Sequence, residues 1–144
     1  MRASVACLSV LLLASTYGCR TPQTSAPRLS TSPSGLGVAD LAPGSGVSPR
    51  LGQTCVVEAL GWVEENGQKG RLFLDTRKRG YPATFPLGVG RVIKGWDEGL
   101  ATMKQGGKRL LRVPPALGYA PHEIGDDIPP GATLLFELDL VDIR

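Results

Sequence analysis

Residues 89–103 read VGRVIKGWDEGLATM, and they hold the only helical pattern that we find in the folded part of the chain. Apolar residues recur there at spacings of three and four, which places them on one face of a helix. These residues are Val92, Ile93, Trp96, Leu100 and Met103. A helix this short, with Gly99 inside it, is marginally stable in water. We therefore expect other elements to hold it, so that Trp96 is either plain core or the floor of a pocket.

Strand patterns lie on both sides of this helix. The clearest covers residues 134–141, where a dry even-numbered set alternates with a partly polar odd-numbered set. The 19 glycines and 12 prolines favour a turn-rich β protein. We predict strands at residues 36–41, 53–63, 71–76, 83–87, 108–113 and 134–141. The sequence thus predicts an α+β fold, in which an antiparallel sheet of five to six strands curls around one short helix.

The first 18 residues have the pattern of a signal peptide. Arg2 supplies a positive start and an apolar run follows over residues 5–14, too short to span a bilayer, which takes about 20 residues. Two interpretations of Cys19 remain open. In the first, it is the lipidated cysteine of a bacterial lipoprotein, because LLLASTYGC resembles that signal, although Thr16 stands where Leu is more usual. In the second, Cys19 is a free thiol or lies within the peptide that is removed.

Residues 19–35 are rich in Ser, Thr and Pro and predict a flexible linker, which would hold the folded domain, residues 36–144, away from a membrane surface. The formal net charge is only +3, and the one basic cluster, residues 77–79, has no aromatic residues among its cations. We therefore expect no nucleic-acid binding. Once export removes Cys7, only Cys19 and Cys55 remain. Since Cys55 lies in an apolar strand pattern, we expect no disulfide framework.

Few residues are available for catalysis. The single histidine, His122, has no cysteine or carboxylate at metal-ligand spacing, so we expect no metal. Cys55 has no histidine partner for a thiol nucleophile, and no cofactor motif is present. Rotation about an X–Pro bond needs none of these groups. Its barrier of about 18–20 kcal/mol reflects amide resonance, and a dry aromatic pocket disfavours the polar planar amide relative to the twisted transition state.

Several long segments together resemble the FKBP family of peptidyl-prolyl isomerases over residues 36–144. They are GQTCVV, RKRGYPATFPLGVGRVIKGWDEGL, MKQGGKRLLRVPPALGYA and IPPGATLLFELDLVDI, in the family's order. The resemblance implies a sheet curled around a short helix and isomerase activity on proline-containing polypeptides without a cofactor. It also implies binding of macrolide immunosuppressant-type ligands. Together with the signal peptide, it implies work on folding proteins of the bacterial cell envelope, on the periplasmic side, with attachment to a membrane through Cys19.

The resemblance also implies a set of site residues. Trp96 matches the tryptophan at the pocket floor. Val92 and Ile93 match the pocket wall, where the Ile93 backbone N–H would meet the substrate carbonyl. The remaining matches are Tyr119, whose hydroxyl would contact ligand, the pocket aromatics Phe85 and Phe136, and Ile128, which would close the groove.

Two departures from the family bear on activity. Ala59 stands where the family has a pocket tyrosine. The segment between Gly61 and Phe73 is longer than usual, so the family's Phe-Asp pair has two placements. One uses Phe73 and Leu74 and loses the carboxylate; the other, which we favour, uses Leu74 and Asp75, with Phe73 still beside the groove. The departures leave a second hypothesis open, a chaperone-like or peptide-binding module with weak or no isomerase activity.

Overall fold

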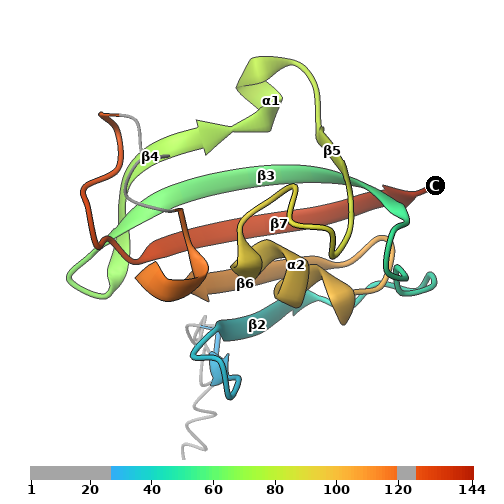
Figure 1. Ribbon diagram of the computed structural model, residues 1–144, viewed down its shortest axis with the longest axis horizontal. Coiled ribbons are helices and arrows are strands. Elements are labelled where there is room, and N and C mark those ends of the chain that lie inside the picture. Colours follow the sequence, from blue (N-terminus) through green and yellow to red (C-terminus); the bar gives the residue numbers. More distant parts are fainter. Residues whose placement is uncertain (1–26, 120–125) are drawn as a thin grey trace, which may run out of the picture.

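The computed structural model describes residues 27–119 and 126–144, and within these ranges it shows one antiparallel sheet with a short helix on its inner face (Figure 1). The strands are β1 Ser30–Thr31, β2 Gly37–Ala42, β3 Thr54–Glu65, β4 Gln68–Asp75, β5 Ala83–Pro86, β6 Lys108–Val113 and β7 Leu134–Ile143. The helices are α1 Thr76–Arg79, α2 Lys94–Ala101 and the 3-10 turn η1 Pro115–Leu117. None of the helices in this part of the chain is long and apolar enough to cross a membrane. The predicted α+β fold is confirmed.

The sheet has the strand order β1-β2-β6-β7-β3-β4, and β5 pairs with the free edge of β3 beside β4. Its central strand β7 shows why the alternation in the sequence was informative. Leu134, Phe136, Leu138 and Leu140 are buried, whereas Val141 on the opposite face is exposed. The inner face of the sheet therefore carries the hydrophobic core, and the outer face carries charged side chains.

Helix α2 packs closely onto β6 because two of its residues are glycines. A Cβ atom on Gly95 would lie 2.8 Å from Val113, and a Cβ atom on Gly99 would lie 2.5 Å from Leu111. Such distances are far inside ordinary contact, so the helix can approach the strand only without side chains at these positions. The glycine that weakens the isolated helix thus permits its packing on the sheet.

Arg109 fixes the end of α2 against the sheet. Its side chain is almost fully buried on β6 and pairs with Asp40 on β2, with an Nε–Oδ1 distance of 2.6 Å. Its Nη1 donates to the Gly99 carbonyl and to the Thr102 hydroxyl. One buried cation therefore connects the last turn of α2 with two strands, and it satisfies a helix carbonyl that would otherwise lack a partner.

Residues 30–31, which the sequence placed in the flexible linker, belong to the sheet, and residues 32–35 form the turn after them. Ser30 and Thr31 pair with Val38 and Gly37, so the sheet has seven strands instead of five to six. The turn that follows is held because the hydroxyls of Ser32 and Ser34 donate to the Glu98 carboxylate on α2. The predicted signal peptide, residues 1–18, and Cys19 lie outside the described residues, as does His122.

Candidate functional site

Four aromatic side chains form a continuous chain on the inner face of the sheet. Trp96 lies at its centre, with its ring centroid 5.7 Å from that of Phe85 and 5.3 Å from that of Phe136. Phe136 in turn makes a T-shaped contact with Phe73 at 5.6 Å. All four were predicted from the sequence as site residues, and the fold brings them together from β5, α2, β7 and β4.

Gly61 on β3 makes room for two of these rings. It pairs with Phe136 across the β3–β7 ladder. A Cβ atom there would lie 2.8 Å from the Phe136 ring and 2.9 Å from the tip of Phe73. Only glycine therefore lets both rings lie against the same point of the strand. The sequence offered no periodic signal for this role, because it depends on two residues distant along the chain.

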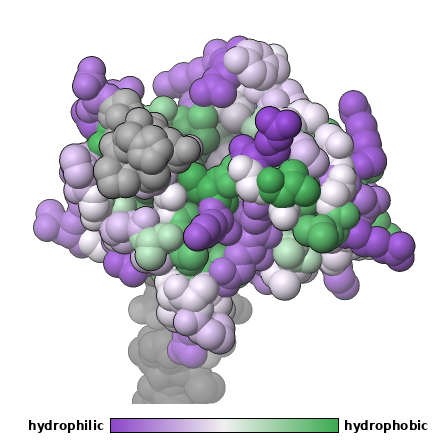
Figure 2. Space-filling view, viewed as in Figure 1, coloured by the Kyte–Doolittle hydropathy of each residue, from purple (hydrophilic) through white to green (hydrophobic). Residues whose placement is uncertain are grey.

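The predicted wall residues Val92 and Ile93, and the other predicted site residues Tyr119 and Ile128, pack against the core that holds this aromatic chain. All four are half-buried, and the core cluster contains both Trp96 and Phe136. Tyr119 and Ile128 also line a hollow of about 20 Å³, together with Pro115, Pro129, Gly131, Ala132 and Leu134. Figure 2 shows hydrophobic residues gathered in the middle of the face on which α2 lies, with hydrophilic residues around them.

The backbone at the start of α2 presents an unused donor. Ile93 is the N-cap residue of the helix, and its carbonyl accepts hydrogen bonds from the N–H groups of Trp96 and Asp97 at 3.0 and 3.3 Å. The N–H of Ile93 itself donates to none of the described residues. An N–H without an acceptor in the described part of the chain takes an outside acceptor, such as water or a ligand carbonyl.

Asp97 holds the loop between β5 and α2, a role that the sequence analysis missed. Its carboxylate accepts hydrogen bonds from the backbone N–H groups of Gly88 at 2.8 Å and Gly90 at 3.3 Å. The two glycines have positive φ angles, of 76° and 73°, which a side-chain-bearing residue adopts with difficulty. Asp97 thus fixes the path of the chain immediately before Val92 and Ile93.

Trp96 is only 5% exposed, yet its indole Nε1 has no hydrogen-bond partner among the described residues. An indole N–H usually finds a partner when buried. The ring packs among the aromatic and aliphatic side chains of the core, so its N–H lies in apolar surroundings. This is the kind of environment that stabilises a less polar state of a bound amide.

Asp75, which we predicted to keep a polar role at the groove, also caps helix α1. Its Oδ1 accepts hydrogen bonds from the N–H groups of Arg77 at 3.0 Å and Lys78 at 3.2 Å, so the carboxylate is the N-cap of α1. Phe73 occupies the aromatic position beside Phe136, and Leu74 packs against the core. Asp75 caps the helix because α1 begins at Thr76, and the residue before a helix start is favourably one with a side-chain acceptor such as Asp.

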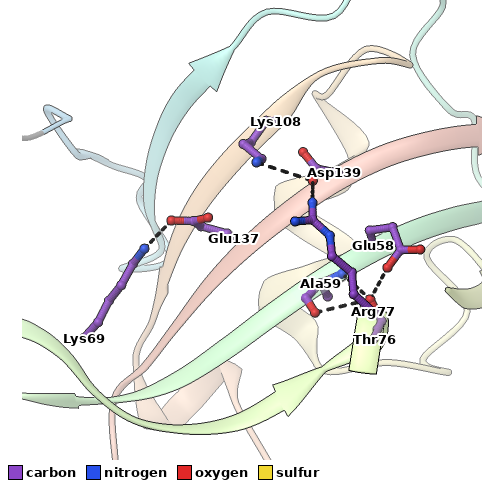
Figure 3. Close-up of polar contacts among 8 residues, drawn as sticks. All are labelled: Glu58, Ala59, Lys69, Thr76, Arg77, Lys108, Glu137 and Asp139. Carbon is purple, nitrogen blue, oxygen red and sulfur yellow. Dashed lines mark hydrogen bonds and ion pairs between the residues drawn. The ribbon is translucent and has the colours of Figure 1, made fainter. Parts of the chain in front are cut away.

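Thr76 connects α1 to β3 on the outer side of the sheet (Figure 3). Its side chain is buried; its hydroxyl accepts a hydrogen bond from the Ala59 N–H at 2.9 Å and donates to the Glu58 carboxylate. Ala59 is also buried, and it brings no polar group to the inner face where a tyrosine was expected from the family. The contact between Thr76 and β3 therefore fixes the end of β4, and with it Phe73, relative to β3.

Ion pairs across the outer face support the same region (Figure 3). Asp139 on β7 accepts from Arg77 of α1 at 2.8 Å and lies 3.5 Å from the Lys108 ammonium of β6. Glu137 pairs with Lys69 of β4. These pairs are partly solvated, so each contributes little alone; their arrangement joins α1 and the β3–β4 hairpin to the centre of the sheet.

No cluster of three or more His, Cys, Asp or Glu side chains in the described part of the chain could hold a metal ion. Cys55 is fully buried on β3. Burial raises the pKa of its thiol, and the negative charge of Asp97 raises this pKa further. The thiol is therefore kept in its unreactive protonated form.

Comparisons with known proteins agree with this arrangement. The family profile described as FKBP-type peptidyl-prolyl cis-trans isomerase matches residues 46–141. An FK506-binding protein of Neisseria meningitidis serogroup B is 48% identical over 109 residues, which cover 76% of this chain and 96% of that protein. The crystal structure of AtFKBP13 superposes with a TM-score of 0.72 at 38% identity, covering 81% of this chain and 99% of the other. FkpA from Escherichia coli gives a TM-score of 0.72 at 36% identity, covering 81% and 51% of the two chains. The chain belongs to the FKBP-type peptidyl-prolyl cis-trans isomerases.

Proposed function

We propose that this protein accelerates X–Pro bond rotation in proteins of the bacterial cell envelope, using the groove around Trp96. The observation that carries the proposal is the pairing of an apolar aromatic floor with an unused backbone N–H at Ile93. Val92, Tyr119 and Ile128 would form the walls, and Phe73, Phe85 and Phe136 would complete the floor. Asp75, which caps α1, would keep the polar role that we predicted for it beside the groove.

Rotation about the X–Pro bond requires few chemical groups from the protein. The amide must lose its resonance as it twists, against a barrier of about 18–20 kcal/mol. The planar amide is more polar than the twisted one, so a water-free aromatic surface raises the free energy of the ground state more than that of the transition state. The Ile93 N–H would hold the substrate carbonyl in one orientation without itself donating a proton. No nucleophile, metal or cofactor enters the reaction.

The test is an isomerisation assay on an X–Pro peptide with the full chain, paired with a binding assay on the same peptide. A Trp62→Phe variant leaves Trp96 as the single tryptophan, so its fluorescence reports on the groove alone. We expect accelerated isomerisation and a change in Trp96 emission at similar peptide concentrations. A Trp96→Ala variant should lose most of the acceleration. An absence of acceleration at micromolar enzyme would refute the proposal.

A second function deserves the same assays, because Asp75 is a helix cap and Ala59 adds no polar group to the groove. On this hypothesis the domain binds proline segments as a chaperone-like module without accelerating their rotation. Peptide binding to the Trp62→Phe variant without isomerisation would support it. Isomerisation that saturates with the same peptide concentration as the Trp96 signal would exclude it.

We further propose that residues 1–18 are a signal peptide and that Cys19 is lipidated, with the chain up to about residue 29 as the linker to a domain that begins near β1. The pattern LLLASTYGC supports this proposal. A Cys19→Ala variant should move the protein from the membrane fraction to the soluble fraction, and unchanged membrane association would contradict it. The name of the Neisseria relative, FK506-binding protein, supports testing a macrolide of that type as an inhibitor.

A further inference from the structure

Two exposed cations flank the wall of the groove. Arg91 precedes Val92, and Lys94 follows Ile93; both side chains are exposed. Consecutive Cα atoms lie about 3.8 Å apart. The Cα atoms of Arg91 and Lys94 are therefore each this far from the Cα atom of a wall residue. Neither forms an ion pair with any residue that the structure describes.

The neighbouring carboxylates on α2 are already engaged. Asp97 accepts hydrogen bonds from Gly88 and Gly90, and Glu98 accepts them from serine hydroxyls. Most other carboxylates in the described ranges also have hydrogen-bond or ion-pair partners; these are Asp40, Glu58, Glu64, Glu65, Asp75, Glu137, Asp139 and Asp142. Within residues 27–119 and 126–144, no carboxylate forms an ion pair with the positive charge beside the wall.

The position of Lys94 is electrostatically unfavourable in the free protein. It is the first residue of α2, where the backbone N–H groups carry partial positive charge and a negative group is favoured. An anionic group bound beside it would offset this repulsion. Asp126 and Asp127, which precede Ile128, are exposed and have no ion-pair partner among the described residues. They would repel the same anionic group near Ile128.

We propose that Arg91 and Lys94 make this enzyme select proline segments that carry an acidic residue on one side of the X–Pro bond. The inference rests on the proposed isomerase function. The substrate carboxylate remains solvated at the rim of the groove, so the attraction mainly speeds encounter. It is screened by salt over about 8–10 Å. The expected gain in kcat/KM is therefore modest, about threefold to fivefold at low salt.

The experiment compares four peptides that differ at one residue, Glu or its neutral isostere Gln, placed two residues before or two residues after the proline. With the full chain at low salt, Glu should exceed Gln about threefold to fivefold in one of the two placements, and this ratio should fall toward one at high salt. Equal rates for Glu and Gln in both placements would overturn the inference and leave the isomerase function standing. No isomerisation of any peptide would overturn both.

Three variants identify the source of the selectivity. The double variant Arg91→Gln with Lys94→Gln should bring the ratio to about one, and the corresponding double change to Glu should favour a peptide with Lys in the same placement. The matched control is Lys104→Gln, which removes an exposed, unpaired cation just beyond the other end of α2. This control should leave the ratio unchanged. If it lowers the ratio as much as the double variant does, net charge and not the rim is responsible, and the inference fails.

Discussion

At the scale of single residues, the site depends on the absence of a side chain at Gly61 as much as on the aromatic side chains around it. Trp96 and Phe136 could be expected from the sequence because they lie within long matching segments. The role of Gly61 could not, since it follows from the approach of Phe136 on β7 and Phe73 on β4 to one point of β3. The absence of a side chain at Gly61 lets the aromatic chain extend from Phe85 to Phe73.

We predict that Gly61→Ala destabilises the protein by about 1–3 kcal/mol, because the new methyl group overlaps two rings. Isomerase activity should fall with it, since both rings must move away from the floor. The matched control is Gly70→Ala on β4, where the added Cβ would meet only the flexible side chain of Glu65. Urea unfolding measures both variants. A Gly61→Ala protein as stable as Gly70→Ala would show that the rings do not depend on this glycine.

At the scale of elements, the β3–β4 hairpin is the part of the fold in which the sequence left two placements for the family's Phe-Asp pair. The pairing of β3 with β4 shifts register twice, between Gly61 and Trp62 and between Trp62 and Glu64. Such bulges change which residue faces the groove, and a sequence comparison cannot decide where they fall. In the structure Asp75 caps α1 at its start, and the Phe73 ring contacts Phe136.

We predict that Thr76→Val lowers the free energy of unfolding by about 1–3 kcal/mol, because the buried Ala59 N–H and the Glu58 carboxylate each lose their hydrogen bond. Thr76→Ser keeps the hydroxyl and should restore most of the loss. If α1 positions Phe73, Thr76→Val should also raise KM for proline peptides under conditions where the protein remains folded. An unchanged KM would limit Thr76 to a purely structural role.

At the scale of the whole molecule, the positions of the main strands and of the one main helix along the chain could be predicted from the sequence, because each pattern is local to its own segment. The ordering of residues 30–35 could not, since Ser32 and Ser34 are ordinary linker residues until Glu98 accepts their hydroxyls. Four of the predicted site residues, the wall residues Val92 and Ile93 together with Tyr119 and Ile128, pack against one core cluster. The cations beside that wall, which have no ion-pair partner among the described residues, could be identified only from the structure.

The free energy of unfolding should decrease at alkaline pH because of Cys55. Burial raises the pKa of this thiol in the folded protein above its unfolded value of about 8.5. The folded state therefore holds a proton that the unfolded chain releases, and the resulting stability is complete below about pH 8.5 and is lost as pH rises toward the folded-state pKa. A Cys55→Ala variant should lack this component. Urea unfolding between pH 7 and about pH 9.5 compares the two slopes, and identical slopes would contradict the prediction.

The central claim is that the Ile93 N–H orients a substrate carbonyl above Trp96, and one substitution tests it directly. The φ angle of Ile93 is −59°, which proline adopts without strain, so Ile93→Pro removes the N–H, while Ile93→Ala controls for the lost side chain. We predict that the wild-type chain accelerates X–Pro isomerisation and that Ile93→Pro is about tenfold slower than Ile93→Ala at matched folding, the effect of a hydrogen bond worth about 1.4 kcal/mol. Equal activity of these two variants, with both folded, would contradict the claim.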